Sequence, residues 1–244
     1  MPLLFKFTAF GRKHMELSPR LRAVAELVPR GAHFADIGTD HAYLPVWLIL
    51  HGVIESAIAA DLRRGPLERA RETAKKYSVS EKMDFRLCDG LTGLREGEAD
   101  TIAIAGMGGE TIANILTAAP WSRGDGITLI LQPMSSQPDL RLWLAENGYT
   151  IERECLAREE KNNYTVMLVK AGVMEPLTPA ELWAGRQSND CLRGEFLDRM
   201  ADKARRALEG QRVAVRKDEA SIERLTQILN GLTEMKKEWE TWQR

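Results

Sequence analysis

The chain has 244 residues, of which 44% are hydrophobic and 28% are charged, and its formal net charge is −1. This length suits one α/β domain with a smaller appendage, and the composition is that of an ordinary globular protein. Three widely spaced cysteines and four histidines without paired spacing predict neither a disulfide framework nor a metal site. No apolar run approaches the roughly 20 residues of a membrane span, and residues 1–14 lack the form of a secretion signal. We therefore expect a cytoplasmic protein.

Charge is distributed unevenly along the chain. Residues 1–31 carry six basic and two acidic side chains, residues 32–185 carry 15 and 22, and residues 186–244 carry 13 and 11. Basic ends around an acidic middle are typical of a protein whose terminal segments meet a polyanion. The alternative is that these charges only solvate helix faces, and charge alone favours this alternative.

Helical and strand patterns alternate through most of the chain. Residues 17–28 predict a first helix, with Ser18 as its cap and Pro19 in its first turn. The expected strands then cover 33–37, 56–62, 84–88, 101–105 and 127–131, and the expected helices cover 43–51, 67–77, 110–118 and 137–147. Two last strands, 150–157 and 164–170, are joined by a polar turn and predict an antiparallel edge hairpin. This order predicts an α/β fold with a Rossmann-like parallel sheet, and it resembles the order of class I methyltransferases.

Strand signals end near residue 173. Residues 174–179 contain two prolines and read as a linker. Two apolar stripes at helical spacing follow, over 192–208 and 222–242, with Gly210 as the expected break between them. Two such helices predict an antiparallel helical hairpin or a short coiled coil.

The first candidate site is the loop Asp36-Ile37-Gly38-Thr39-Asp40-His41-Ala42-Tyr43-Leu44-Pro45, which follows the first strand. Ligands of open α/β sheets bind at the carboxyl ends of the strands. Gly38 permits a sharp turn and close approach of a ligand, and Asp36 can accept hydrogen bonds from a cationic amino group. The loop lacks the later glycines of the dinucleotide motif, and Asp40 would repel a pyrophosphate. The pattern therefore favours S-adenosylmethionine over a dinucleotide. The alternative is that Asp36 and Asp40 only cap the next helix.

Polar or glycine-rich residues also follow the later strands. Asp61 suits two ribose hydroxyls, Asp89-Gly90 can meet an adenine amino group, and Gly106-Met107-Gly108-Gly109 leaves room for a flat base. The alternatives are a helix cap at Asp61 and a phosphate nest or tight turn at the glycines. Gln132-Pro133 fits the same edge of the sheet. The Asn/Asp-Pro-Pro-aromatic motif of methyltransferases that attack exocyclic amines is absent.

The run DIGTDHAYLP, the AGMGGE loop, the LILQP strand end and the helical tail together resemble the bacterial tRNA (adenine-22, N1)-methyltransferase family, TrmK, over about residues 15–243. The resemblance implies S-adenosyl-L-methionine as donor and methylation of adenine N1 at position 22 of tRNA. It further implies a methyltransferase domain over residues 1–173 and a helical coiled-coil domain over residues 174–244 that assists tRNA binding. The chain departs from the family at Met134, where an Asn often follows the Gln-Pro pair, and residues 1–14 precede the usual start.

The expected cofactor-binding residues lie in the first loop and at the later strand ends: Asp36, Gly38, Thr39, Tyr43, Leu44, Asp61, Leu62, Asp89, Gly90, Gly106, Met107 and Gly108. Asp40 and His41 are the catalytic candidates, because a carboxylate would stabilise a cationic N1-methylated base, although a lone histidine is more often structural. Basic side chains of the first helix and the tail would hold tRNA phosphates without specifying the base: Arg20, Arg22, Lys203, Arg205, Arg206, Arg216 and Lys217.

Other functions remain open from the sequence. A methyltransferase of this fold could act on another RNA or on a small molecule, and the basic ends favour RNA. A non-catalytic nucleotide-binding scaffold, whose tail binds a protein, is a further alternative, which the intact cofactor motifs disfavour. A dinucleotide-dependent oxidoreductase fails on the first loop. We expect a monomer or weak homodimer that binds tRNA, no metal and no membrane.

Overall fold

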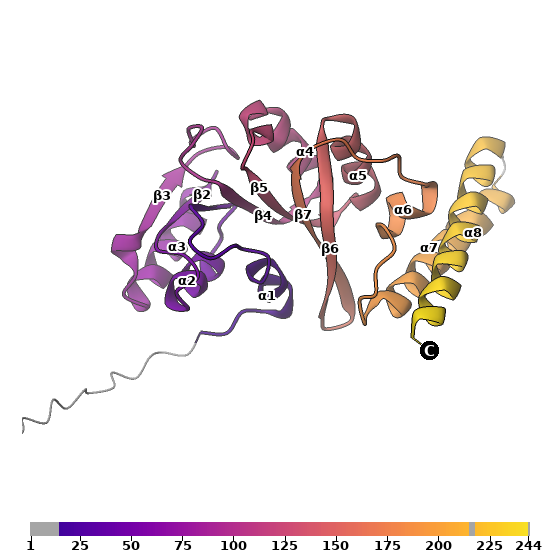
Figure 1. Cartoon of the computed structure of the whole chain (residues 1–244), viewed down its shortest axis with the longest axis horizontal. Helices are drawn as coiled ribbons and strands as arrows, with labels where there is room; N and C mark the ends of the chain where they lie inside the picture. Colours follow the sequence, from indigo (N-terminus) through magenta and orange to yellow (C-terminus); the bar gives the residue numbers. More distant parts are fainter. Residues whose placement is uncertain (1–14, 215–217, 244) are drawn as a thin grey trace, which may run out of the picture.

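The computed structural model describes residues 15–214 and 218–243, so the predicted loose extension at residues 1–14 lies outside it (Figure 1). Seven strands form one sheet in the order β3-β2-β1-β4-β5-β7-β6. They are β1 (Phe34–Ile37), β2 (Ala57–Asp61), β3 (Met83–Leu87), β4 (Thr101–Gly108), β5 (Thr128–Ser135), β6 (Tyr149–Glu159) and β7 (Asn162–Ala171). The first five are parallel, and β7 pairs antiparallel with both β5 and β6. The α/β fold with an edge hairpin is confirmed.

Helices cover both faces of this sheet. They are α1 (Pro19–Ala25), α2 (Tyr43–Leu50), α3 (Arg64–Lys76), α4 (Gly109–Thr117), α5 (Gln137–Glu146), α6 (Pro179–Ala184), α7 (Arg193–Val213) and α8 (Glu219–Trp242), with 3-10 turns η1 (Ser80–Lys82) and η2 (Pro120–Arg123). Ser18 caps α1 as expected, because its hydroxyl accepts a hydrogen bond from Leu21 N. The helix ends at Ala25, earlier than the apolar pattern suggests, because the chain then bends towards β1.

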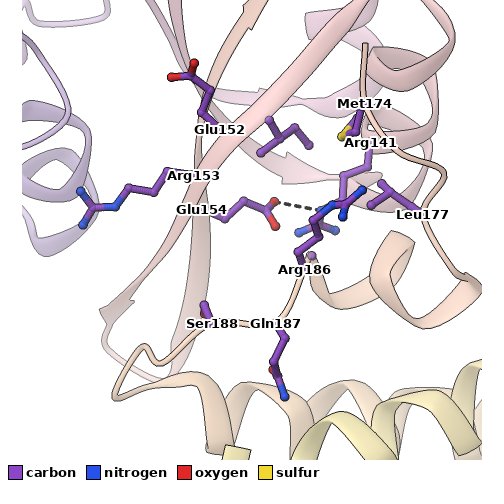
Figure 2. A pocket seen from close by; sticks show the side chains of 11 residues that line it. Arg141, Glu152, Arg153, Glu154, Met174, Leu177, Arg186, Gln187 and Ser188 are labelled. Carbon is purple, nitrogen blue, oxygen red and sulfur yellow. Dashed lines mark hydrogen bonds and ion pairs between the residues drawn. The ribbon is translucent and has the colours of Figure 1, made fainter. Parts of the chain in front are cut away.

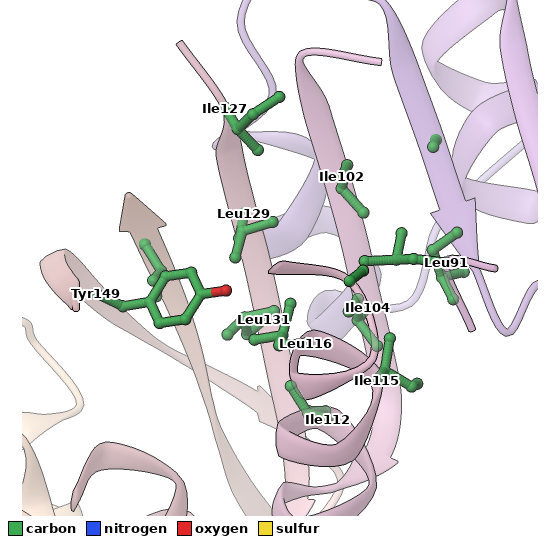
Figure 3. Packing of buried hydrophobic residues seen from close by; sticks show 14 of the residues in the cluster. Leu91, Ile102, Ile104, Ile112, Ile115, Leu116, Ile127, Leu129, Leu131 and Tyr149 are labelled. Carbon is green, nitrogen blue, oxygen red and sulfur yellow. The ribbon is translucent and has the colours of Figure 1, made fainter. Parts of the chain in front are cut away.

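Two apolar layers enclose the sheet. On one face, Ile104 and Leu131 of the strands pack against Ile112 and Leu116 of α4 (Figure 3). The other face packs against α1, α2 and α3. All four residues of β1 are buried, since both faces are covered. Polar side chains can therefore reach a ligand only where these strands end.

Four strands, β4 to β7, extend beyond at least one of their predicted ends. β4 continues through the glycines to Gly108, with register shifts after Ala105 and Met107 where it pairs with β5. The predicted loop there is thus an irregular strand end. The hairpin turn is also shorter than the predicted polar segment, because β6 reaches Glu159 and β7 begins at Asn162.

The C-terminal part forms a helical hairpin beyond the β6 edge, as Figure 1 shows, with α6 between it and the sheet. The predicted linker over 174–179 ends earlier than expected, because Thr178 and Glu181 form a capping box that starts α6 at Pro179. The predicted break at Gly210 is also wrong, since α7 continues to Val213. Nothing packs against Gly210, so a helix tolerates it there. Among the described helices, none has the length and apolar content needed to cross a membrane.

Candidate active site

The carboxyl ends of β1, β2 and β4 meet around one cavity of about 490 Å³. β1 and β4 are neighbours in the sheet although β2 and β3 separate them in sequence, so the cavity lies at the topological switch point. α1 and the start of α2 close its sides. Its lining includes Arg20, Leu21, Asp36, Gly38, Thr39, Asp40, His41, Ala42, Tyr43, Leu44, Asp61, Arg63, Ala105, Gly106 and Met107.

Asp36 is a buried carboxylate at this cavity. The residue is only 7% exposed, and this burial raises the pKa of its carboxyl group from 3.8 to about 6. The Thr39 hydroxyl opposes this rise and the Asp61 carboxylate adds to it. Thr39 Oγ1 is itself buried and makes no hydrogen bond of good geometry. Asp36 does not cap α2, whose N-cap is Ala42 without any side-chain hydrogen bond. The helix-cap interpretation of Asp36 and Asp40 is therefore wrong.

A second cavity of about 200 Å³ adjoins the first. It is lined by Leu62, Asp89 and Gly90 at the ends of β2 and β3, and it shares Gly38, Asp61, Arg63 and Met107 with the larger cavity. The Met107 side chain reaches to Gly38, where a Cβ would overlap its Cε atom. Gly38 has a φ of +78°, so its backbone conformation favours glycine, whereas the flexible Met107 side chain could move aside for a Cβ.

Most of the expected cofactor-binding residues come together at these two cavities. The exception is Gly108, which lines neither of them. It is the N-cap of α4, and a Cβ there would lie 3.1 Å from Ser135 Oγ, so its small size serves the packing of β4 against β5. Asp61 is 8% exposed and accepts a hydrogen bond from Arg63 N at 2.8 Å. The N-cap of α3 is Arg63, so Asp61 supports the start of that helix and also faces the cavities.

The two catalytic candidates lie at the mouth of the larger cavity. Asp40 accepts a hydrogen bond from Arg69 Nε of α3 at 3.1 Å, and His41 Nε2 lies 3.6 Å from the other Asp40 oxygen. The rings of His41 and Tyr43 are parallel, with centroids 4.9 Å apart. Asp40 is thus already neutralised by an arginine that the sequence did not point to. Its catalytic role and that of His41 stay predictions.

Comparison with known proteins agrees with this geometry. Residues 17–167 match the family model described as "Methyltransferase domain". The chain is 40% identical over 158 residues to the tRNA (adenine(22)-N(1))-methyltransferase of Bacillus subtilis, a match that covers 65% of this chain and 66% of that protein, just under two thirds. The crystal structure of the B. subtilis M1A22 tRNA methyltransferase TrmK has a TM-score of 0.81 and 30% identity, and covers 91% of this chain and 100% of that one. The chain belongs to the TrmK family.

The crystal structure of Streptococcus pneumoniae Sp1610, described as a "putative tRNA (m1A22) methyltransferase", is in complex with S-adenosyl-L-methionine. It is 34% identical with a TM-score of 0.76, and the alignment covers 88% of this chain and 100% of that one. The residues present here suit that molecule. Asp36 offers a buried carboxylate to an ammonium, Asp61 offers one to ribose hydroxyls, and the smaller cavity beside Leu62 and Gly90 has room for a flat base.

Gln132 of β5 lies beside the cavity and makes contacts that the sequence did not show. Its side chain is fully buried, and its Oε1 accepts hydrogen bonds from Arg20 Nη1 at 2.7 Å and from Gly106 N at 3.0 Å. It thereby ties α1 to the end of β4. The available signal was a polar residue directly after three apolar ones, in LILQP.

The structure places the predicted phosphate-binding residues in two kinds of surroundings, the cavity wall and the exposed surface of helices. Arg20 lies in the wall of the cofactor cavity, with a side chain 21% exposed, so it is not on a solvated helix face. Arg22 is exposed above the Trp47 ring. On α7, Lys203, Arg205 and Arg206 are exposed, and Arg205 pairs with Asp202. The last two predicted residues, Arg216 and Lys217, lie outside the described residues.

A separate cavity of about 200 Å³ lies between β6 and α6 (Figure 2). Arg141 of α5 and Glu154 of β6 point towards each other there, with Nε and Oε1 2.9 Å apart, while Arg153 points away. Arg141 Nη1 also donates to the carbonyls of Leu182 and Trp183 in α6. These contacts hold α6 against the sheet. Asp36 and Asp61 do not line this cavity. This cavity is therefore a structural junction and distinct from the cofactor site.

Proposed function

We propose that this chain transfers a methyl group from S-adenosyl-L-methionine to N1 of adenine 22 in tRNA. The observation that carries the proposal is the buried Asp36 carboxylate at the β1–β4 switch point, with Asp61 beside it, in a chain of the TrmK family. The B. subtilis relative has this activity in its name. The alternative of a methyltransferase for another RNA shares the same cofactor site, and only the substrate distinguishes it.

The reaction requires the protein mainly to position the methyl donor and adenine N1 relative to each other. When bound, S-adenosylmethionine supplies a methyl group attached to a positively charged sulfur. The lone pair of adenine N1 forms the new bond as the carbon–sulfur bond breaks, and the positive charge passes to the base. Asp36 and Asp61 would hold the donor, and the absence of side chains at Gly38 and Gly106 would let it approach the backbone and align there. Carboxylates near the base would stabilise its positive charge.

The mouth of the cavity offers a surface for an extruded base. His41 and Tyr43 present parallel rings there, and their side chains remain partly exposed. An adenine inside a folded tRNA must leave its stack to reach a pocket, and aromatic rings are the usual surface that receives it. We assign His41 this stacking role and assign Asp40, with Arg69, the role of fixing the loop.

The helical hairpin would supply further contacts to tRNA. Lys203 and Arg206 are exposed on α7, and each can neutralise a phosphate without reading sequence. We therefore treat residues 1–173 as the methyltransferase domain and residues 174–244 as a helical domain that assists tRNA binding. The enzyme would act in the cytoplasm as a monomer or weak homodimer, without a metal.

Two matched tRNA transcripts test the proposal. One carries adenine at position 22 and the other carries guanine there with its pairing partner adjusted, and both are incubated with the protein and labelled S-adenosylmethionine. We expect labelling of the first transcript only. Equal labelling of both would refute the position, and no labelling of either, with cofactor binding intact, would favour another substrate.

A further inference from the structure

The junction cavity between β6 and α6 carries more positive than negative charge. Of the five charged residues that line it, Glu152 and Arg153 point away from it (Figure 2), which leaves Arg141, Glu154 and Arg186. Glu154 pairs with Arg141 at 2.9 Å. Arg186 has no carboxylate partner among the described residues, and its Nη2 donates only to a backbone carbonyl. One guanidinium at the cavity is therefore not neutralised.

Arg141 also has an unused donor at this cavity. The residue is fully buried, its Nε donates to Glu154, and its Nη1 donates to the carbonyls of Leu182 and Trp183. Its Nη2 donates to no acceptor within the described part of the chain. Gly185 lies beside it, and a Cβ there would be 3.3 Å from Nη2. Buried guanidinium groups normally have partners for their donors, so the free Nη2 indicates a ligand.

A second buried guanidinium stands behind the cavity wall. Arg193 of α7 is 3% exposed and donates to the two carbonyls that end α6. Burial lowers the pKa of Arg193 to about 10, and the nearby charge of Arg141 lowers it further, against the opposing effect of Glu154, Asp190 and Glu181. Asp190 and Glu181 already accept hydrogen bonds from backbone N–H groups. Two buried guanidiniums thus share the Glu154 carboxylate.

The other walls of the junction cavity differ in polarity. On one side, the backbone N–H groups of residues 186–188 find no acceptor among the described residues. On the other side, Ile151, Met174 and Leu177 form an apolar wall. The volume of about 200 Å³ is below the roughly 300 Å³ at which pockets for drug-sized molecules begin, so the cavity suits a ligand of a few carbon atoms.

We propose that the junction cavity binds a small organic anion, whose carboxylate or phosphate head lies between Arg141 and Arg186 and whose short apolar body rests on the apolar wall. Guanidinium groups and free backbone N–H groups are the donors that such heads prefer. Because Arg141 also holds α6, a bound anion would stabilise the attachment of α6 to the sheet. None of the residues that line this cavity lines the cofactor cavities, so the site is independent of the proposed function.

Four small probes test the two halves of this site. Calorimetry measures the binding of butyrate, butyl phosphate, inorganic phosphate and butanol to the wild-type chain. We expect butyrate or butyl phosphate to bind at one site per chain, and the tighter of the two identifies the head group. Inorganic phosphate and butanol should each bind at least about tenfold more weakly than that ligand, because one lacks the apolar body and the other lacks the charge.

Three variants locate the binding. Arg186→Gln should weaken binding of the tighter anion about tenfold, and Arg186→Lys should restore part of the loss. Leu177→Ala should weaken the two butyl ligands about threefold and leave inorganic phosphate unchanged. Arg153→Gln is the matched control, because it removes the same charge from a side chain that points away from the cavity, and it should bind within about twofold of wild type.

The opposite results would overturn the proposal. Absence of saturable binding for both anions would exclude the site. Equal losses in Arg186→Gln and Arg153→Gln would assign the binding to overall charge, and butanol binding as tightly as butyrate would exclude recognition of an anion. Arg186 is exposed, so its variants should fold. If Arg186→Gln failed to fold, unchanged binding of the butyl ligands by Leu177→Ala would place them outside this cavity.

Discussion

The cofactor end of the sheet and the helical hairpin use charge in opposite ways. At the strand ends, two carboxylates are almost fully buried, at 7% and 8% exposure for Asp36 and Asp61. On the hairpin, several charges are exposed and pair along their own helices, as Arg199 does with Glu195 and Lys237 with Glu234. A buried charge interacts strongly with a bound ligand, whereas an exposed pair contributes little and is screened by salt. Single substitutions should therefore abolish function at the first region and only weaken it at the second.

Replacing Asp36 should give the largest effect. Asp36→Ala removes the buried carboxylate that we assign to the cofactor's ammonium, so S-adenosylmethionine should bind about 1,000-fold more weakly, or roughly 4 kcal/mol. Calorimetry measures this loss. Asp125→Ala, at an exposed turn near the start of β5, is the control and should bind normally. Binding by Asp36→Ala within about threefold of wild type would show that the carboxylate does not contact the cofactor.

The ion pair between Arg141 and Glu154 does not follow this contrast, because it is a buried pair next to α6 and away from the cofactor cavity. Arg141 is fully buried, and Arg141→Met would leave Glu154 and two α6 carbonyls without their partner. We expect the free energy of unfolding to fall by about 3 kcal/mol in chemical denaturation. Arg153→Met, on the exposed side of the same strand, should cost less than about 0.5 kcal/mol. Equal stability of both variants would mean that Arg141 does not hold α6.

The pH dependence of cofactor binding should report the burial of Asp36. Its folded pKa is about 6 against 3.8 when unperturbed, so the carboxylate is ionised only above about pH 6. Cofactor affinity should thus fall roughly tenfold per pH unit below pH 6, and Asp36→Asn should remove this dependence. Without cofactor, the protonated carboxyl of Asp36 favours the folded state. Its contribution to the free energy of unfolding is fully present below pH 3.8 and is lost as the pH rises through about 6. A flat affinity profile between pH 5 and 7 would contradict this assignment.

Gly38 and Gly126 allow the effect of backbone strain alone to be separated from the effect of a crowded position next to the cofactor cavity. Gly38 and Gly126 both have positive φ, at +78° and +84°, but only Gly38 is approached by another side chain, that of Met107. Both alanine variants should lose about 1 kcal/mol of stability in thermal or chemical unfolding. Only Gly38→Ala should also bind S-adenosylmethionine about tenfold more weakly. If Gly126→Ala lost the same affinity, the effect would come from general destabilisation.

The smallest effect belongs to the hairpin surface. Lys203→Glu combined with Arg206→Glu should weaken tRNA binding about fivefold at low salt. The slope of the logarithm of the binding constant against the logarithm of the salt concentration should fall by the equivalent of about two phosphate contacts. Filter binding over a series of salt concentrations measures both. Lys237→Glu on α8 is the control, since Lys237 is already paired with Glu234. An unchanged salt dependence in the double variant would exclude this face from the tRNA interface.

The sequence predicted the positions of the strand-end acids better than those of Arg20 and Arg141, for a physical reason. Asp36 and Asp61 lie at the carboxyl ends of apolar strands, and that local pattern survives in the fold. Arg20 and Arg141 owe their positions to partners more than ten residues away, which no periodicity reveals. The short α6 carried a readable signal in its Thr178–Glu181 capping box, but the surrounding prolines suggested a linker.

The identity of the methylated atom tests the central claim most directly. Wild-type protein is incubated with unmodified tRNA and labelled S-adenosylmethionine, and the RNA is then digested to nucleosides and separated by chromatography. The proposed function and the absent Asn/Asp-Pro-Pro-aromatic motif predict that the label appears in N1-methyladenosine. Label in N6-methyladenosine, or in a nucleoside other than adenosine, would contradict the account.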